Sequence, residues 1–383
     1  MRLPIRYSIR NLFRRKTRTA LTVAAVAMVT AVAVVMFGFA RGVLQTAKDS
    51  GSADNIVVMD RKAASMAFSK ITLRDLNLIK SLPQIARDAA DRPLISPEAL
   101  HQSRLDVGEH KGRPATVRGV LPELFEVNRK VHMVAGERPS SGRKVAVGSL
   151  AHATLGVPEQ ALATGAVLKF QNQDWTIVGH FSAGGTALDS EILADLSDVM
   201  AVYQRDSYSA VLIKLASVSD VTPLVRALND RNDVQVKAVE ERQYYRGLAE
   251  GFERVILLAV GMAIVAAIGG LVSGMNTMYA SVLSRVREIG TLKVLGFKSG
   301  DIVLSFVVES LAIAALGGAL GCAAGWLANG VSAKISTSAF TITVDQQALL
   351  AGACVAALIG LIGALPPALK GARMAITEAL HAN

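Results

Sequence analysis

The sequence predicts a membrane protein with four transmembrane α-helices and one large extracytoplasmic α+β domain between the first two helices. The first observation is composition: 51% of the 383 residues are hydrophobic and only 19% are charged. The second is that four apolar runs are long enough to cross a bilayer, which requires about 20 residues of helix. The third is that segment 42–250 is polar, mixed in charge and large enough to fold as a domain.

The apolar runs locate the crossings. The first, 19–41, contains 22 consecutive uncharged residues from Thr19 to Ala40. A signal peptide has an apolar core of only about 7–15 residues, and no clear cleavage site follows, so we expect an uncleaved helix. The other crossings are predicted at 255–279, 303–328 and 348–369. The third carries one charged residue, Glu309, and the fourth is expected to end at the helix breakers Pro366 and Pro367.

Basic residues orient these helices, because cytoplasmic flanks are enriched in Lys and Arg. The first 18 residues contain seven basic residues and no acidic residue. The short loop after the third crossing contains only Lys334 and Asp345 as charged residues. The sequence therefore predicts a cytoplasmic location for 1–18, for the loop 280–302 and for the tail 370–383, and an extracytoplasmic location for 42–250 and 329–347.

Segment 1–18 is also expected to form an amphipathic helix on the inner membrane surface. Pro4 suits a first helical turn. Apolar side chains gather on one face and arginines on another: Ile5, Ile9, Leu12 and Phe13 against Arg6, Arg10 and Arg14. A plain extension of the first crossing is the alternative. A basic segment can also bind nucleic acid, but the apolar run that follows favours anionic lipid, and we expect no nucleic-acid partner.

The extracytoplasmic segment is expected to fold as one α+β lobe with a β-rich insertion. Asn55–Met59 and Ala210–Leu215 are rich in Val and Ile, which is typical of strands. Leu73–Leu82 has apolar residues at helical spacing. A strand, helix and strand are predicted in sequence over 210–239. Between these two ends of the segment, 92–202 is mostly β, with short apolar runs separated by glycines.

Glycines repeat every four residues on two of the predicted membrane helices. Small residues at this spacing let helix backbones approach closely. The repeats are Gly270 and Gly274 on the second crossing, and Gly317, Gly321 and Gly325 on the third. They are predicted to be helix-packing positions, either within one four-helix unit or between subunits.

The segment Arg285–Gly296 is charged and helix-forming, and it lies between two apolar runs. Gly296 suits a C-terminal stop, and Ser299 is expected to cap the next helix. Ile289, Leu292 and Leu295 are predicted to form an apolar ridge. Such a ridge at a membrane surface can enter the lipid or fit a groove in a partner protein. The sequence itself leaves both alternatives open.

No enzyme signature is present in the sequence. It contains no Gly-x-x-x-x-Gly-Lys-Ser/Thr, His-Glu-x-x-His or Gly-x-Ser-x-Gly motif. Five histidines of the extracytoplasmic segment have unrelated spacings, so we expect no catalytic residue and no metal site. Cys322 and Cys354 are expected to be small packed helix residues. A carboxylate inside a membrane helix is a functional candidate, so Glu309 either forms interfacial or inter-helix hydrogen bonds or acts on a substrate or proton.

One long motif resembles a known family. Met275–Gly296, read as MNTMYASVLSRVREIGTLKVLG, is similar to the signature of the FtsX/MacB-type permeases of ABC transporters. Matching positions are Asn276, Ser281, Arg285, Arg287, Glu288, Ile289, Gly290, Leu295 and Gly296, with Val294 where the family more often has Ala. Glu309 followed by glycines, and the tail around Glu378, are also similar, although the usual Pro of the tail is replaced by Ile376-Thr377.

The resemblance implies a non-catalytic permease subunit of a bacterial inner-membrane ABC transporter, with a MacB-like periplasmic core domain. It assigns the contact with a cytoplasmic ATP-binding subunit to Arg285, Arg287, Glu288, Ile289, Gly290, Leu292, Leu295 and Gly296. ATP and Mg would be used by that separate subunit, and this chain would bind no cofactor. Further partners implied are a second permease copy, membrane lipids and a periplasmic adaptor.

The function implied is mechanotransmission, in which ATP hydrolysis moves the periplasmic domain. Export or extraction of a hydrophobic or amphipathic substrate is the first expectation. An FtsX-like permease that signals to a periplasmic cell-wall hydrolase is the alternative. The sequence does not distinguish lipoprotein, peptide, antibiotic, haem or lipid as cargo.

Overall fold

The computed structural model describes residues 16–231, 233–335 and 338–375, and its contacts divide the chain into two units. One is helical and contains residues up to 41, 253–331 and 342 onwards. The other is an α+β domain of residues 42–252 joined by 332–341. The predicted fold class is confirmed. The predicted N-terminal amphipathic helix lies almost entirely outside the described residues.

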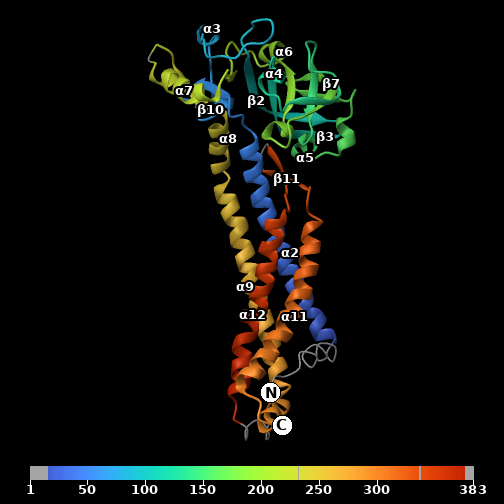
Figure 1. Cartoon of the computed structure of the whole chain (residues 1–383). Helices are drawn as coiled ribbons and strands as arrows, with labels where there is room; N and C mark the ends of the chain where they lie inside the picture. The colour runs from blue at the N-terminus through green and yellow to red at the C-terminus, as the bar shows by residue number, and fades with distance from the viewer. Residues whose placement is uncertain (1–15, 232, 336–337, 376–383) are drawn as a thin grey trace. The chain divides into compact units, whose positions relative to one another are not determined.

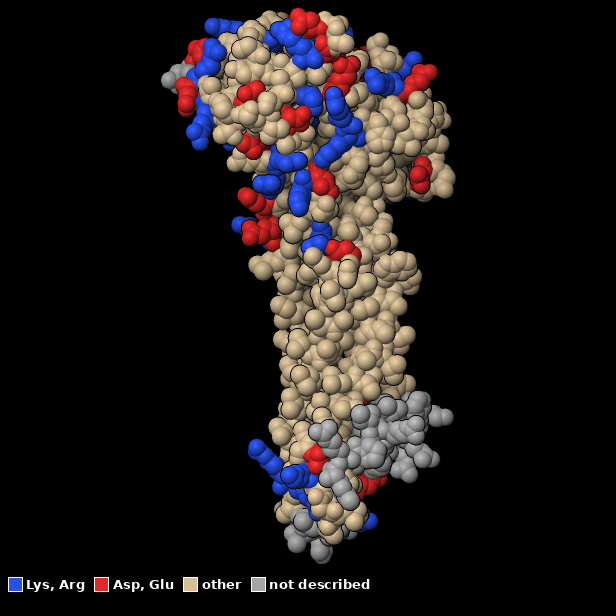
Figure 2. Space-filling view, viewed as in Figure 1, with Lys and Arg blue, Asp and Glu red and all other residues tan. Residues whose placement is uncertain are grey.

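Among the residues that the structure describes, four helices are long and apolar enough to cross a membrane. They are α2 (Lys16–Asp49), α9 (Glu253–Leu283), α11 (Ser299–Trp326) and α12 (Gln346–Arg373), and a shorter helix, α10 (Val286–Val294), lies between α9 and α11. The four long helices run side by side (Figure 1). On the face drawn in Figure 2, charged side chains are absent from the middle of this unit, as a hydrocarbon environment requires.

The prediction that the fourth crossing ends at Pro366 and Pro367 is wrong, because α12 continues to Arg373. A proline costs a helix about 3 kcal/mol, since its N–H is missing and its ring crowds the preceding turn. Here the residues after the prolines, Ala368, Gly371 and Ala372, are all buried against neighbouring helices. In membrane bundles such packing tolerates prolines that would end an isolated helix.

Helix α11 packs against α2 through its glycines. A Cβ atom at Gly321 would lie 2.4 Å from the carbonyl oxygen of Ala27 and 2.6 Å from Cβ of Thr30. Gly317 and Gly325 face Val26 and Val34 in the same way, at 2.8 and 2.7 Å. These three glycines therefore face a helix of the same chain. Gly270 of α9 likewise meets Val29 at 2.9 Å.

The α+β domain is built on a sheet whose strands follow the order β10-β1-β9-β2-β3-β8-β5-β7-β4, with β6 paired to β2 and β7. The strands are β1 (Asn55–Asp60), β2 (Ile95–Val107), β3 (His110–Val120), β4 (His132–Gly136), β5 (Lys144–Gly148), β6 (Val167–Phe170), β7 (Gln173–Ser182), β8 (Ile192–Asp195), β9 (Ala210–Lys214) and β10 (Val236–Glu240). The helices are α3 (Leu73–Lys80), α4 (Leu124–Val127), α5 (Ala151–Leu155), α6 (Leu196–Val202), α7 (Val221–Asp230) and α8 (Glu241–Glu250).

Strand β2 joins two lobes of this domain. Its first residues, Ile95–Glu98, pair with β9, and the part from Ala99 onward pairs with β3. The first lobe contains β1, β9 and β10 with α3 and α7, so it is assembled from both ends of the segment. The second lobe is the β-rich insertion, with Trp175 fully buried in its core and stacked on Phe170 at 4.5 Å between ring centroids. A hairpin that the sequence did not suggest, β11 (Ser332–Ile335) and β12 (Ser338–Thr341), also belongs to this domain.

The glycine contact between α11 and α2 can be tested by adding one methyl group. We expect Gly321→Ala to lower the stability of the helical unit by about 1–3 kcal/mol, because the new Cβ would overlap a backbone carbonyl that cannot rotate away. Gly261→Ala on α9 is the matched control, since nothing lies within 4 Å of that position. Thermal unfolding of the purified protein in detergent measures both. Equal melting temperatures for the two variants would contradict this account of the packing.

Candidate functional site

Helix α10 occupies the segment that the sequence singled out, and its two ends are sharply defined. The chain leaves α9 at Leu283 and turns so that the N–H of Arg285 donates to the carbonyl of Val282 at 3.0 Å. At the other end Gly296 has φ +88°, a left-handed conformation that glycine adopts without steric cost. The N–H groups of Gly296 and Phe297 return to the carbonyls of Lys293 and Leu292. This is the hydrogen-bond pattern of a glycine-terminated helix, so the predicted stop is confirmed.

The start of α11 differs from the prediction. Lys298 occupies the N-cap position, and Ser299 is the first helical residue. The Asp301 carboxylate accepts from the N–H of Lys298 at 3.3 Å, which satisfies a donor at the helix start. The hydroxyl of Ser299 instead donates to the carbonyl of Ala372 at 3.1 Å. Ser299 therefore joins α11 to α12 and does not cap its own helix.

Arg285 and Glu309 form an ion pair between the start of α10 and the interior of α11. Nη1 lies 2.7 Å from Oε2 and Nη2 lies 3.0 Å from Oε1, so the guanidinium holds both carboxylate oxygens. The side chains are only 17% and 6% exposed. The guanidinium also lies 5.8 Å from the ring centre of Phe306. An inter-helix hydrogen bond is thus present at Glu309, and it accounts for a carboxylate inside an otherwise apolar helix.

Further contacts fix α10 to α12. Ile289 is 2% exposed and packs in a cluster with residues of α9, α11 and α12. The Lys293 ammonium donates to the carbonyl of Met374 at 2.6 Å. Gly371 lets α12 approach closely, because a Cβ there would lie 2.4 Å from Cγ1 of Val282. A displacement of α10 would therefore act on three long helices at once.

The structure divides the predicted contact residues into two sets. Three lie inside the helical unit: Arg285, Ile289 and Gly290. Leu292 is half-buried, and Arg287, Glu288, Leu295 and Gly296 are exposed. The predicted apolar ridge is therefore wrong at Ile289, because that side chain completes the core under α10. Val294, 62% exposed, lies beside Leu295, 65% exposed, and the sequence analysis missed it. These two residues form the exposed apolar end of α10.

A second group of buried charges, which the sequence did not reveal, lies in the α+β domain. Arg118 of β3 holds Glu191 through Nε and Nη2 at 2.6 and 2.8 Å, and it also contacts Glu98 of β2. The side chains of Arg118 and Glu98 are 4% and 3% exposed. Burial raises the pKa of Glu98 against the attraction of Arg118. Burial opposes the charge of Arg118, but Glu191 and Glu98 together hold its pKa well above the usual value.

Glu241, the first residue of α8, is also buried, at 1% exposure. Its carboxylate accepts from the N–H of Ser52 at 2.9 Å and from the amide of Asn55 at 3.0 Å. Burial raises the pKa of Glu241 to about 7, and these two hydrogen bonds oppose the rise. The bonds tie the start of α8 to the chain that enters β1.

The described residues give no further candidate for chemistry. Within residues 16–231, 233–335 and 338–375, no three His, Cys, Asp or Glu side chains form a group that could hold a metal ion. The histidines His101, His110, His132, His152 and His180 belong to the α+β domain. Cys322 is half-buried, but Cys354 is exposed on α12, so the expectation that both are packed is wrong for Cys354.

The described residues thus form a membrane protein with four membrane-length helices, an α+β domain inserted after the first of them, and a short helix between the second and third. The chain belongs to the MacB/FtsX-like ABC transporter permeases. The family model of the MacB-like periplasmic core domain matches residues 19–231, and that of the FtsX-like permease C-terminal domain matches residues 260–376.

Individual proteins are also similar to this chain. An uncharacterized ABC transporter permease of Bacillus subtilis, YknZ, is 25% identical over 98% of this chain and 98% of that protein. The macrolide export ATP-binding/permease protein MacB of Nitrobacter winogradskyi is 25% identical over 95% of this chain, which spans 58% of the relative's length. The crystal structure of the periplasmic region of MacB from Actinobacillus actinomycetemcomitans aligns with a TM-score of 0.40 and 14% identity, covering 54% of this chain and 97% of that chain.

The ion pair can be tested by removing one charge and then both. We expect Glu309→Gln to destabilise the helical unit by about 3 kcal/mol, because it leaves the Arg285 guanidinium buried without a partner. Replacing both residues by Gln removes the unpaired charge, so the double variant should be more stable than Glu309→Gln. Thermal unfolding in detergent and hydrogen exchange of the α10 amides measure the difference. If Glu309→Gln were as stable as the wild type, the ion pair between Arg285 and Glu309 would not be a stabilising contact.

The raised pKa of Glu241 predicts a pH dependence. An ordinary Glu titrates near pH 4.3 in the unfolded chain. Between about pH 4.3 and 7, Glu241 is therefore protonated in the folded protein and ionised in the unfolded chain. The contribution of this residue to stability is therefore full below that window and falls as the pH rises through it, by roughly 3 kcal/mol. Relative to Glu241→Gln, the wild type should lose stability from pH 4.5 to 7.5.

The readout is unfolding of the domain followed by the fluorescence of the buried Trp175, in a Trp326→Phe background that removes the second tryptophan. Glu240→Gln is the control, because it removes the same charge from a half-buried neighbour. If Glu240→Gln flattened the pH profile as much as Glu241→Gln, Glu241 would not be the responsible group.

Proposed function

We propose that this chain is the permease subunit that couples ATP hydrolysis by a cytoplasmic ATP-binding subunit to movement of its α+β domain. The observation that carries the proposal is the construction around α10. The exposed apolar end of α10, Val294 and Leu295, is available to a partner, while the opposite side is fixed to α9, α11 and α12. A partner that moves α10 therefore moves the membrane helices.

The chain itself connects those helices to the domain. Helix α2 continues without interruption from Lys16 to Asp49, so its last turns belong to the α+β domain. Helix α9 begins at Glu253, three residues after α8 ends at Glu250. A continuous helix transmits displacement along its axis with little loss. We therefore infer that motion passes along these two connections, and that no channel through the bundle is needed.

In this scheme ATP and Mg are used by the partner, and the chain carries no phosphate-binding loop motif of its own. The basic cytoplasmic flanks support an inner-membrane orientation in which α10 faces the cytoplasm and the α+β domain faces the periplasm. Export of an amphipathic molecule is favoured over signalling to a cell-wall hydrolase, because the MacB relative is named for macrolide export. A second permease copy and a periplasmic adaptor would complete the assembly.

The proposed contact is tested by placing a photocrosslinking amino acid at Leu295 in native membranes. We expect Leu295 to capture an ATP-binding subunit, identified by mass spectrometry, because its side chain is 65% exposed at the end of α10. Leu327 is the control, since it is 77% exposed but follows the opposite end of α11. Capture of the same subunit from Leu327, or of no ATP-binding protein from Leu295, would overturn the proposal.

A second test separates binding from folding. Leu295→Asp should weaken association with the captured subunit by roughly tenfold and lower its vanadate-sensitive ATPase activity, because a charge enters an apolar contact. Leu295→Met keeps the apolar surface and should behave as the wild type. Thermal unfolding of the permease should be unchanged in both variants. Normal association of Leu295→Asp would exclude this surface as the contact.

A further inference from the structure

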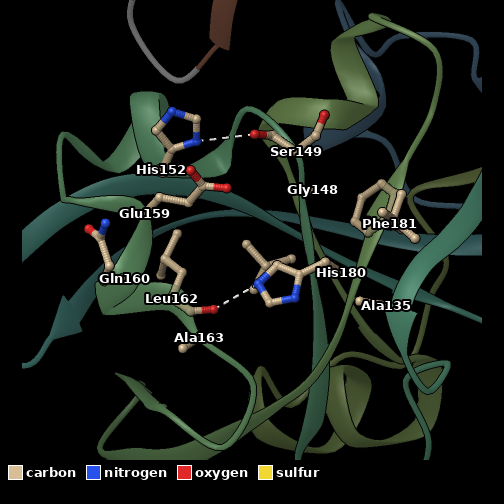
Figure 3. A pocket seen from close by; sticks show the side chains of 12 residues that line it. Ala135, Gly148, Ser149, His152, Glu159, Gln160, Leu162, Ala163, His180 and Phe181 are labelled. Carbon is tan, nitrogen blue, oxygen red and sulfur yellow. Dashed lines mark hydrogen bonds between the residues drawn. The ribbon is translucent and has the colours of Figure 1, made fainter.

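A cavity of about 460 Å³ lies in the β-rich lobe of the α+β domain, which is a size suited to a small organic ligand. Its walls come from the ends of β5 and β7, from the edge strand β4, and from the segment around η2 (Glu159–Leu162). Figure 3 shows these elements around the opening, with side chains converging from both sides. All of its lining residues belong to one domain.

Most of the lining is apolar. Val147, Leu162 and Phe181 line the cavity and are almost completely buried. At the outer side the pairing of β4 with β7 shifts between Met133 and Ala135, which leaves Val134 in a bulge. The Val134 side chain is 66% exposed beside the cavity. The cavity therefore presents apolar surface for the body of a ligand.

Three polar side chains of the cavity, those of His180, His152 and Ser149, use a donor hydrogen within the protein. Nε2 of His180 donates to the carbonyl of Leu162 at 2.8 Å, and Nδ1 of His152 donates to the carbonyl of Ser149 at 3.1 Å (Figure 3). A carbonyl only accepts, so each ring nitrogen named here carries the hydrogen. In a neutral imidazole the other nitrogen is then an acceptor.

Two further side chains also offer acceptors. The hydroxyl of Ser149 donates to Oδ1 of Asp189 at 2.8 Å, which leaves its lone pairs for a ligand. Glu159 contributes a carboxylate, which accepts only and carries a negative charge. Among the described residues that line the cavity, none is Lys or Arg, and the Gln160 side chain carries amide donors. The side chains of Ser149, His152, His180 and Glu159 thus offer acceptors, and Glu159 adds one negative charge.

We propose that this cavity is a binding site for a small amphipathic amine, with the protonated amine among His152, His180, Ser149 and Glu159 and the apolar body against Val134, Val147 and Leu162. Binding to the isolated permease does not depend on ATP. As a statement about cargo, the inference rests on the proposed export function.

The test uses three probes with the same apolar body: 4-phenylbutylamine, 4-phenylbutanol and 4-phenylbutyrate. Binding to the full chain in phosphatidylcholine nanodiscs is measured by saturation-transfer NMR and calorimetry, with empty nanodiscs subtracted. The amine should bind roughly fivefold tighter than the alcohol, as expected for one solvent-accessible ion pair, and the carboxylate should bind more weakly than the alcohol. Equal affinities for all three probes would overturn the proposal.

Variants locate the site. Glu159→Gln should remove the advantage of the amine while leaving the alcohol unchanged, and Glu109→Gln, an exposed carboxylate in the turn between β2 and β3, should have no effect. Ala163→Trp should block all three probes by filling the cavity. If Ala163→Trp left the affinity for the amine unchanged, the amine would bind outside this cavity and the proposal would be wrong. The nanodiscs contain no ATP-binding subunit. A failure of the amine to bind would therefore overturn the binding site without testing the proposed coupling to ATP hydrolysis.

Discussion

The ion pair between Arg285 and Glu309 is the interaction on which the arrangement of the helical unit depends. An isolated carboxylate within an apolar helix is costly, and so is a guanidinium buried beneath a short helix. Each charge makes the other tolerable, because Nη1 and Nη2 of Arg285 each donate to one carboxylate oxygen of Glu309. The position of α10 is fixed by this requirement, and the core around Ile289 and the bonds to the end of α12 then form around it.

Close approach of backbones is the second constraint. In an apolar solvent there is little hydrophobic force between helices, so their association relies on contact at short range. Gly321 allows α11 to lie against the carbonyl of Ala27, and Gly371 allows α12 to lie against Val282. Helices packed at this distance shift together.

The candidate site was only partly predictable from sequence. The family motif located α10, and the turn chemistry of Gly296 located its end. Which motif residues are exposed could not be derived, because Arg285 and Ile289 are chemically as suited to an outer surface as Leu295 and Arg287 are. Their directions are set by contacts with α9, α11 and α12, which extend to Ala372, 83 residues after Ile289. The Glu98–Arg118–Glu191 group could not be predicted either, because its members come from separate strands or turns that only the fold brings together.

The sequence by itself determined the number of membrane helices, the position of the inserted domain and its two-lobed construction. These properties follow from local features of the sequence: the length of each apolar run, the strand-forming residues, and the glycines that separate the strands. Tertiary structure alone decided that α12 continues through Pro366 and Pro367, that the hairpin 332–341 joins the α+β domain, and that His152 and His180 each donate to a backbone carbonyl beside the cavity. Each of these outcomes depends on the free energy of contacts between segments that are distant in sequence. A pattern within one segment carries no information about those contacts.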